Sequence, residues 1–162
     1  GKPINVDEEL AGLLDYADHC YQISDGLFDI TAGVLRKVWH FDGSDNIPSK
    51  ESVSVLLPLI GWDRIIWQRP SITVPGGMEI DFGGIGKEYA VDRTAQLLRQ
   101  YTEAGFLVNY GGDIFSAGRR KNGHTWIIGI ENPSEESPQT NINQELILKQ
   151  GGMATRCDAR RF

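Results

Sequence analysis

The sequence has 162 residues, of which 40% are apolar, and this is enough to bury a hydrophobic core within one domain. Its formal charge of −6 and pI near 5.0 argue against a nucleic-acid-binding protein, which needs clustered Lys and Arg. No stretch approaches the roughly 20 apolar residues of a membrane span, and two distant cysteines, Cys20 and Cys157, exclude a disulfide scaffold and a cysteine-based zinc site but leave open whether they pair.

Three helices are predicted in the first 60 residues. The first follows Asn5 as its cap, carries apolar residues at helical spacing, and ends at the Ser-Asp-Gly turn of residues 24–26. A shorter helix is predicted over residues 31–39. After a polar loop, residues 49–60 predict a third helix, which Pro58 weakens.

The pattern then changes to short β-prone runs. Residues 64–68, 71–74 and 78–82 predict a small antiparallel meander, because Pro and Gly separate the three runs. The best-patterned helix of the chain is predicted over residues 87–104, with Gly105 as its C-terminal stop.

Four more strands are predicted beyond this helix, over residues 106–110, 114–117, 125–130 and 145–149. A loop rich in Pro, Ser, Gln and Asn, residues 132–143, separates the last two. Helices that flank a mostly antiparallel sheet predict an α+β fold.

The strongest local motif is DFGGIGKEYAVD at residues 81–92, in which a predicted strand ends in a carboxylate, passes through small residues and opens a helix. Its glycines allow the backbone to approach a ligand closely, and the first N–H groups of a helix favour an anion. Lys87 would add a positive charge there. The motif has neither the spacing of a Walker A loop nor the glycine order of a Rossmann fingerprint. The alternative is a tight strand-to-helix turn in which glycines are present only for steric reasons.

This motif resembles the signature of the ApbE-like flavin transferases, and three further segments resemble elements of that family in the same order. They are SDGLFDIT at residues 24–31, LVNYGGDI at 107–114 and WIIGIENP at 126–133. A fifth segment, GMATRCDARRF at 152–162, matches less well, because Arg156 and Cys157 stand where the family has Ser-Gly. A side chain there would be strained if the turn needs a positive φ, which leaves the effect of these two residues on activity open.

The resemblance implies an Mg-dependent FAD:protein FMN transferase with a T-fold-like architecture. Such enzymes cleave FAD at its pyrophosphate, attach FMN through a phosphoester to a Thr or Ser of a target protein, and release AMP. A hard divalent cation is also expected on physical grounds, since it would neutralise charge that develops during phosphoryl transfer. The implied acceptor is a subunit of a membrane-bound redox complex. The implied location is the periplasmic side of the bacterial inner membrane, where the enzyme would be a membrane-associated lipoprotein.

Five residues match family positions that contact FAD. Leu27, Phe28 and Asp29 match the flavin-contacting triplet, while Asp81 and Lys87 match two further positions. Without the resemblance, Phe28 is a core residue and Asp29 is a cap for the helix predicted at residues 31–39.

The remaining matched positions surround these. Gly84 matches a glycine whose backbone carbonyl binds magnesium, which suits a cation that prefers oxygen ligands. Asn109, Gly112 and Asp113 are expected to shape the neighbouring wall of the FAD site. The alternative for Asp113 is a structural carboxylate that accepts hydrogen bonds from turn N–H groups. Thr155 matches a family threonine without an assigned role.

Residues 1–162 are expected to be the central part of one flavin transferase domain, an incomplete fragment that is inactive alone. The resemblance places the family's His, the candidate base, and its side-chain magnesium ligands beyond Phe162, so no catalytic residue is assigned. The chain's own His19, His40 and His124 do not match that position and are expected to be non-catalytic. Two alternatives stay open: a flavin-binding domain without transferase activity, and a structural or partner-binding domain that has lost its ligand.

Overall fold

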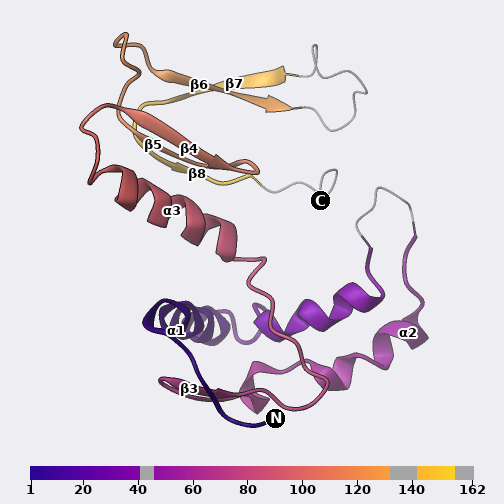
Figure 1. Cartoon of the computed structure of the whole chain (residues 1–162). Coiled ribbons are helices and arrows are strands. Elements are labelled where there is room, and N and C mark those ends of the chain that lie inside the picture. The colour runs from indigo at the N-terminus through magenta and orange to yellow at the C-terminus, as the bar shows by residue number, and fades with distance from the viewer. Residues whose placement is uncertain (41–45, 132–141, 156–162) are drawn as a thin grey trace. The chain divides into compact units, whose positions relative to one another are not determined.

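The computed structural model describes residues 1–40, 46–131 and 142–155. The chain divides into two compact units, Gly1–Gly84 and Ile85–Phe162, each of which combines helical structure with β-sheet (Figure 1). Within the described ranges, no helix combines the length and the apolar character needed to cross a bilayer. That all 162 residues belong to one transferase domain stays a prediction.

The first helix of unit 1, α1, spans Glu8–Ile23 and buries Ala11, Leu14 and Ala17. Its cap is Asp7, whose carboxylate accepts a hydrogen bond from the Leu10 N–H at 2.8 Å. The prediction that Asn5 caps this helix was wrong, because Ile4–Asn5 forms a short strand, β1, whose backbone pairs with a later strand.

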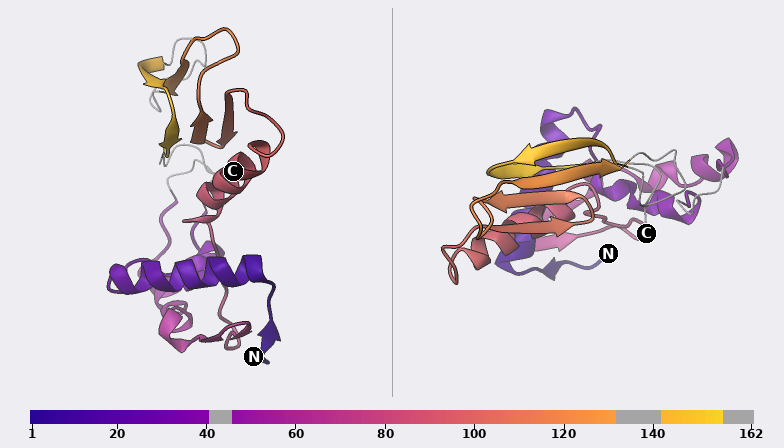
Figure 2. Two further views of the ribbon diagram at one scale, coloured as in Figure 1. Left: turned by 90° about the vertical axis from the view of Figure 1, so that its left-hand side faces the viewer. Right: turned by 90° about the horizontal axis from the view of Figure 1, so that it is seen from above.

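The sheet of unit 1 has the strand order β1-β3-β2, with β2 at Ile66–Gln68 and β3 at Ser71–Thr73. Both pairings are antiparallel, so the predicted meander is confirmed for two of its three runs. The third run, residues 78–82, is not a strand, and β1 takes its place in the sheet. Helix α1 lies beside this sheet (Figure 2), and the Trp67 indole N–H donates to Asp15 at 2.7 Å.

The other helices of unit 1 are short. The second predicted helix is a 3₁₀ helix, η1, at Ile30–Lys37. The third is broken into α2 at Lys50–Ser54 and the 3₁₀ turn η2 at Leu57–Leu59, which contains the proline that weakened the prediction. A further 3₁₀ turn, η3, covers Trp62–Arg64.

Unit 2 is built on α3, Gly86–Leu98, which packs against an antiparallel sheet of order β4-β5-β8 (Figure 1). The strands are β4 at Phe106–Tyr110, β5 at Asp113–Ala117 and β8 at Gly151–Met153. The buried residues between helix and sheet are Val91, Ala95 and Val108, with Leu98, Phe106 and Phe115 packed around them.

Helix α3 ends earlier than predicted. Its last turn tightens, and the Tyr101 N–H bonds the Leu98 carbonyl three residues back at 2.9 Å. Gly105 is therefore not the helix stop and instead directly precedes β4.

A hairpin completes unit 2. Strands β6, Trp126–Glu131, and β7, Ile142–Leu148, pair antiparallel, with Trp126 opposite Leu148. Most of the predicted loop between them, residues 132–141, lies outside the described residues. Strand β8 was not predicted, because its two glycines are poor strand formers. Every described strand pairing is antiparallel, and the α+β prediction is confirmed.

Candidate functional site

The loop before η1 presents Leu27 to solvent, with 92% of its surface exposed. The Ser24 hydroxyl donates to the Tyr21 carbonyl at 3.2 Å and accepts from the Phe28 N–H at 2.9 Å. Asp25 and Gly26 between them have positive φ values of 52° and 78°. This tight turn, which the Ser-Asp-Gly sequence predicted, fixes the direction in which the chain reaches Phe28.

Phe28 packs against Gly84. This contact brings the motif of residues 24–31 against the start of the motif of residues 81–92, inside unit 1. A Cβ atom built on Gly84 would lie 2.8 Å from Cε2 of the Phe28 ring, so any larger residue would require the ring to shift. Asp81 shapes the turn that leads there, since its Oδ1 accepts from the Gly83 N–H at 2.7 Å. The boundary between the two units falls directly after Gly84, inside the motif of residues 81–92.

The segment before this turn, residues 79–81, packs against η1 and is hydrogen-bonded to it. The Asp81 N–H donates to the Ile30 carbonyl at 2.8 Å, and a Cβ on Gly33 would lie 2.4 Å from the Asp81 Cβ. Two residues earlier, Glu79 pairs with Arg36 at 2.6 Å and with Lys37 at 2.7 Å. Gly33 was not among the residues predicted for the site, although a glycine inside a predicted helix is itself a signal of close packing.

Two pKa shifts mark this part of unit 1. A hydrogen bond from Lys37, supported by the charges of Arg36 and Lys37, lowers the pKa of Glu79. Partial burial raises the pKa of the Tyr21 phenol, and the nearby carboxylates of Asp63 and Asp29 raise it further. Tyr21 therefore stays protonated at neutral pH, while Glu79 stays ionised.

The Asp29 carboxylate is bonded to the chain itself. Its Oδ1 accepts from the Thr31 N–H at 2.8 Å and from the Thr31 hydroxyl at 2.7 Å, and its Oδ2 accepts from the Trp62 N–H at 3.0 Å. The Thr31 hydroxyl in turn accepts from the Gly61 N–H at 2.8 Å. Asp29 thus caps η1, which is the alternative drawn from the sequence, and its contact with a flavin stays a prediction.

In unit 2, two of the residues predicted for the site form an ion pair. The Lys87 ammonium, in the first turn of α3, lies 2.8 Å from Oδ2 of Asp113 and 3.4 Å from the Gly111 carbonyl. The Asp113 side chain is 3% exposed and that of Lys87 is 44% exposed. Lys87 therefore neutralises a buried carboxylate and still reaches solvent.

Several of the predicted site residues form or contact the turn between β4 and β5. Gly111 and Gly112 have φ values of 58° and 91°, and a two-residue type I′ hairpin needs positive φ at both positions. Asn109 accepts from the N–H of Gly112 in this turn at 2.9 Å. Thr155 donates its hydroxyl to the Gly112 carbonyl at 3.1 Å, a role that the sequence did not suggest. Arg156 and Cys157 lie outside the described residues.

The predicted magnesium ligand is the backbone carbonyl of Gly84. In the part of the chain that the structure describes, no group of three or more His, Cys, Asp or Glu residues could hold a metal ion. Magnesium binding stays a prediction, with Gly84 as the only ligand that the sequence assigned to this chain.

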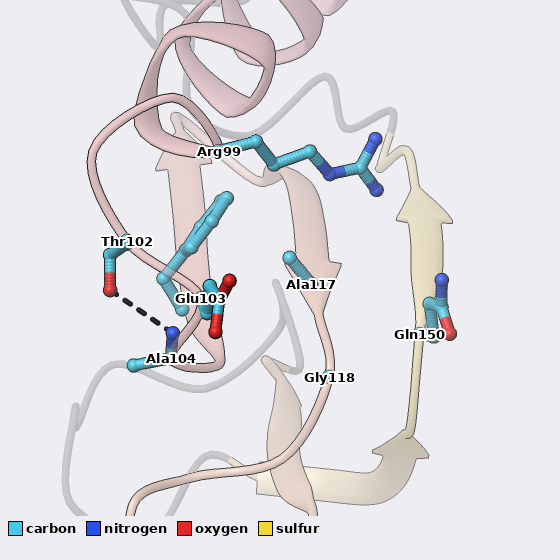
Figure 3. Close-up of a pocket in the computed structure, with 8 residues that line it drawn as sticks. Arg99, Thr102, Glu103, Ala104, Ala117, Gly118 and Gln150 are labelled. Carbon is cyan, nitrogen blue, oxygen red and sulfur yellow. Dashed lines mark hydrogen bonds between the residues drawn. The ribbon is translucent and has the colours of Figure 1, made fainter.

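A hollow of about 350 Å³ lies in unit 2 at the C-terminal end of α3 (Figure 3). It is lined by Arg99, Thr102, Glu103, Ala104, Phe106, Ala117, Gly118 and Gln150. The Arg99 guanidinium lies over the Phe115 ring, 5.1 Å from its centre. None of the predicted site residues lines this hollow, and it is not part of the candidate site.

Comparison with known proteins gives a consistent result. A model of the ApbE family matches residues 1–162. The FAD:protein FMN transferase of Haemophilus influenzae is 26% identical over 98% of this chain and 48% of its own length, and that of Chlamydia pneumoniae is 31% identical over 80% and 42%. The crystal structure of the ApbE protein from Thermotoga maritima is 30% identical, with a TM-score of 0.78 over 94% of this chain and 50% of that one. The flavin transferase ApbE from Vibrio cholerae, 23% identical with a TM-score of 0.78 over 99% of this chain and 53% of that one, shows likeness of fold.

The chain spans about half the length of the curated relatives that it matches. The family model covers every motif on which the resemblance was drawn, and the mixed helices and antiparallel sheets match solved ApbE structures. The chain belongs to the ApbE family.

Proposed function

We propose that this protein, at the length its relatives have, is an FAD:protein FMN transferase. In that reaction a Thr or Ser hydroxyl of the acceptor protein attacks the phosphorus of the FMN moiety. The phosphoanhydride bond of FAD breaks, AMP leaves with the bonding electrons, and the hydroxyl proton is lost. The relatives' name, FAD:protein FMN transferase, supports both the nucleotide and the protein acceptor.

The observation that carries the proposal is the contact of Phe28 with Gly84. It joins two motifs that are separated in sequence and that both match flavin-transferase elements. Leu27, exposed over 92% of its surface, stands next to that contact and offers an apolar side chain to a planar ligand such as a flavin ring. These residues support binding of the flavin by unit 1.

Unit 2 supports binding of an anionic group. Lys87 lies in the first turn of α3, where backbone N–H groups favour a phosphate. An ammonium has three donors, and the contacts with Asp113 and Gly111 use two of them, so a phosphate oxygen can take the third. Asp113 and Asn109 then act by holding Lys87 and the β4–β5 turn in place.

Magnesium is part of the proposal, with the Gly84 carbonyl as its contact in this chain. When bound, the ion would supply charge neutralisation at the pyrophosphate. An acceptor subunit in a membrane-bound redox complex, and a lipoprotein's place on the periplasmic side of the bacterial inner membrane, are likewise proposed from the family resemblance.

The test is a titration of the protein with FAD, followed by flavin fluorescence, with and without Mg²⁺. AMP release is then measured in the presence of an acceptor peptide with a Ser/Thr-Gly-Ala-Ser/Thr stretch. We expect residues 1–162 to bind FAD without releasing AMP, and the protein at the length of its relatives to release AMP and label the peptide.

The other outcomes identify the alternatives. FAD binding without AMP release at the relatives' full length would indicate a flavin-binding protein that has lost transfer. No change in flavin fluorescence at either length would indicate a structural or partner-binding domain. AMP release by residues 1–162 alone would contradict the prediction that the base lies beyond Phe162.

A further inference from the structure

We propose that Asp29 and Thr31 act together as a positioning pair that holds Phe28 against Gly84, and that the Asp29 side chain is not itself a flavin contact. This inference rests on the proposed function, in which FAD binds next to the contact between Phe28 and Gly84. It changes the role of Asp29 from the one implied by the family match, and it gives a role to Thr31, which the 24–31 motif contains but for which the match implied none.

The first step is the closed hydrogen-bond network around these two side chains. Three hydrogen bonds reach the Asp29 carboxylate, and a fourth joins the Thr31 hydroxyl to the Gly61 N–H. Thr31 is fully buried, Trp62 is 4% exposed and Asp29 is half-buried, so the Thr31 and Trp62 ends of these bonds are shielded from water. The network therefore ties the start of η1 to the backbone that enters η3.

The second step is the position of Phe28 between fixed points. On one side, its N–H donates to the Ser24 hydroxyl at 2.9 Å. On the other side, Asp29 is held by the network, and the Ile30 carbonyl accepts from the Asp81 N–H at 2.8 Å. The network is one of these fixed points, and we expect its loss to release the backbone after Phe28 and let the ring move away from Gly84.

The third step concerns what the Asp29 carboxylate can still do. A carboxylate offers about four acceptor sites, and three are used by bonds of 2.7 to 3.0 Å within unit 1. The one acceptor site that remains is on Oδ2, which already accepts from the Trp62 N–H. The exposed side chain next to Phe28 is instead Leu27.

A double-mutant cycle tests this directly. Asp29→Asn removes an acceptor for the Trp62 N–H, and Thr31→Val keeps the shape of Thr31 without its hydroxyl. Each single variant is expected to raise the FAD dissociation constant about tenfold. The double variant should stay within about twofold of the weaker single variant, because both act through one network. Thr31→Ser, which keeps the hydroxyl, should bind FAD within about twofold of wild type.

Ser116 provides a matched control in unit 2. It is also fully buried, and its hydroxyl donates to the Gly118 carbonyl at 3.2 Å. Ser116→Ala should lower the melting temperature without changing the FAD dissociation constant. Effects of Asp29→Asn and Thr31→Val that multiply to about a hundredfold would show that Asp29 contacts the flavin itself and would overturn the inference. An unchanged dissociation constant in Thr31→Val would overturn it as well.

Amide hydrogen exchange measures, without FAD, whether the Asp29–Thr31 network stabilises the backbone at Phe28 and Gly83. The Phe28 and Gly83 amides each donate to a side chain, at 2.9 and 2.7 Å. Both should exchange faster in Thr31→Val and in Asp29→Asn than in Ser116→Ala. If this pattern were seen while wild-type protein failed to bind FAD, the proposed function would be wrong and the positioning pair would stand. Equal exchange in all variants would exclude the positioning pair.

Discussion

The Lys87 ammonium lies 2.8 Å from Oδ2 of Asp113, a carboxylate that is almost fully buried. The contact joins the first turn of α3 to the start of β5. A buried carboxylate is stable only with compensating charge or hydrogen bonds. The lysine of the 81–92 motif therefore has a structural task in unit 2 whether or not a phosphate is bound.

Replacing Lys87 by Met is expected to lower the free energy of unfolding by about 2 kcal/mol. This is less than the cost of breaking a fully buried pair, about 3–5 kcal/mol, because Lys87 is half-exposed. The double variant Lys87→Met/Asp113→Asn should recover at least half of the loss, since no charge then stays buried. Urea unfolding at neutral pH measures both, and a double variant less stable than Lys87→Met would contradict the explanation.

Gly112→Ala is expected to destabilise the protein by about 3 kcal/mol. A positive φ of 91° costs an L-residue about 1–2 kcal/mol, and the new Cβ would lie 2.2 Å from the Thr155 hydroxyl oxygen. Gly123→Ala is the matched control, with a φ of 80° and no neighbouring atom within 4 Å of its Cβ. Thermal unfolding should show a clearly smaller loss for the control. Equal losses would mean that the Thr155 contact contributes nothing.

Gly33→Ala and Gly12→Ala should change stability in opposite directions. A Cβ on Gly33 would lie 2.4 Å from the Asp81 Cβ, so we expect a loss of about 1–3 kcal/mol as η1 and the 79–81 segment separate. Gly12 lies in α1 with nothing within 4 Å, and alanine there should stabilise by about 0.5–1 kcal/mol. Denaturant midpoints test both, and a neutral Gly33→Ala would show that the contact is not tight.

Stability should fall in acid through Glu79. The folded state lowers the pKa of this carboxyl below its usual 4.5, chiefly through the hydrogen bond from Lys37. Its contribution is thus complete above pH 4.5 and is lost as the pH falls through the folded-state pKa. The stability difference between wild type and Glu79→Gln, followed by urea unfolding over this range, should shrink as the pH is lowered. A constant difference would show that the charge of Glu79 is not involved.

Local chemistry was predictable from the sequence wherever a few neighbouring residues decide it. The Ser-Asp-Gly turn and the cap of η1 at Asp29, which was the alternative drawn from the sequence, both depend on contacts within a few positions. The motif pattern also identified the family. Element ends were less predictable: residues 78–82 have a strand-like pattern, yet Asp81 bonds the Ile30 carbonyl of η1 and not a neighbouring strand.

The choice of partners for buried polar groups was decided only by the tertiary structure. No spacing in the sequence indicates that the Thr31 hydroxyl bonds Gly61, or that Thr155 bonds Gly112. Such pairs form because folding brings distant segments together and excludes water. A buried polar atom is then stabilised by a hydrogen bond to a neighbouring group of the protein. Sequence motifs therefore named the residues of the candidate site, while packing determined which of them contact one another and which hold the others in place.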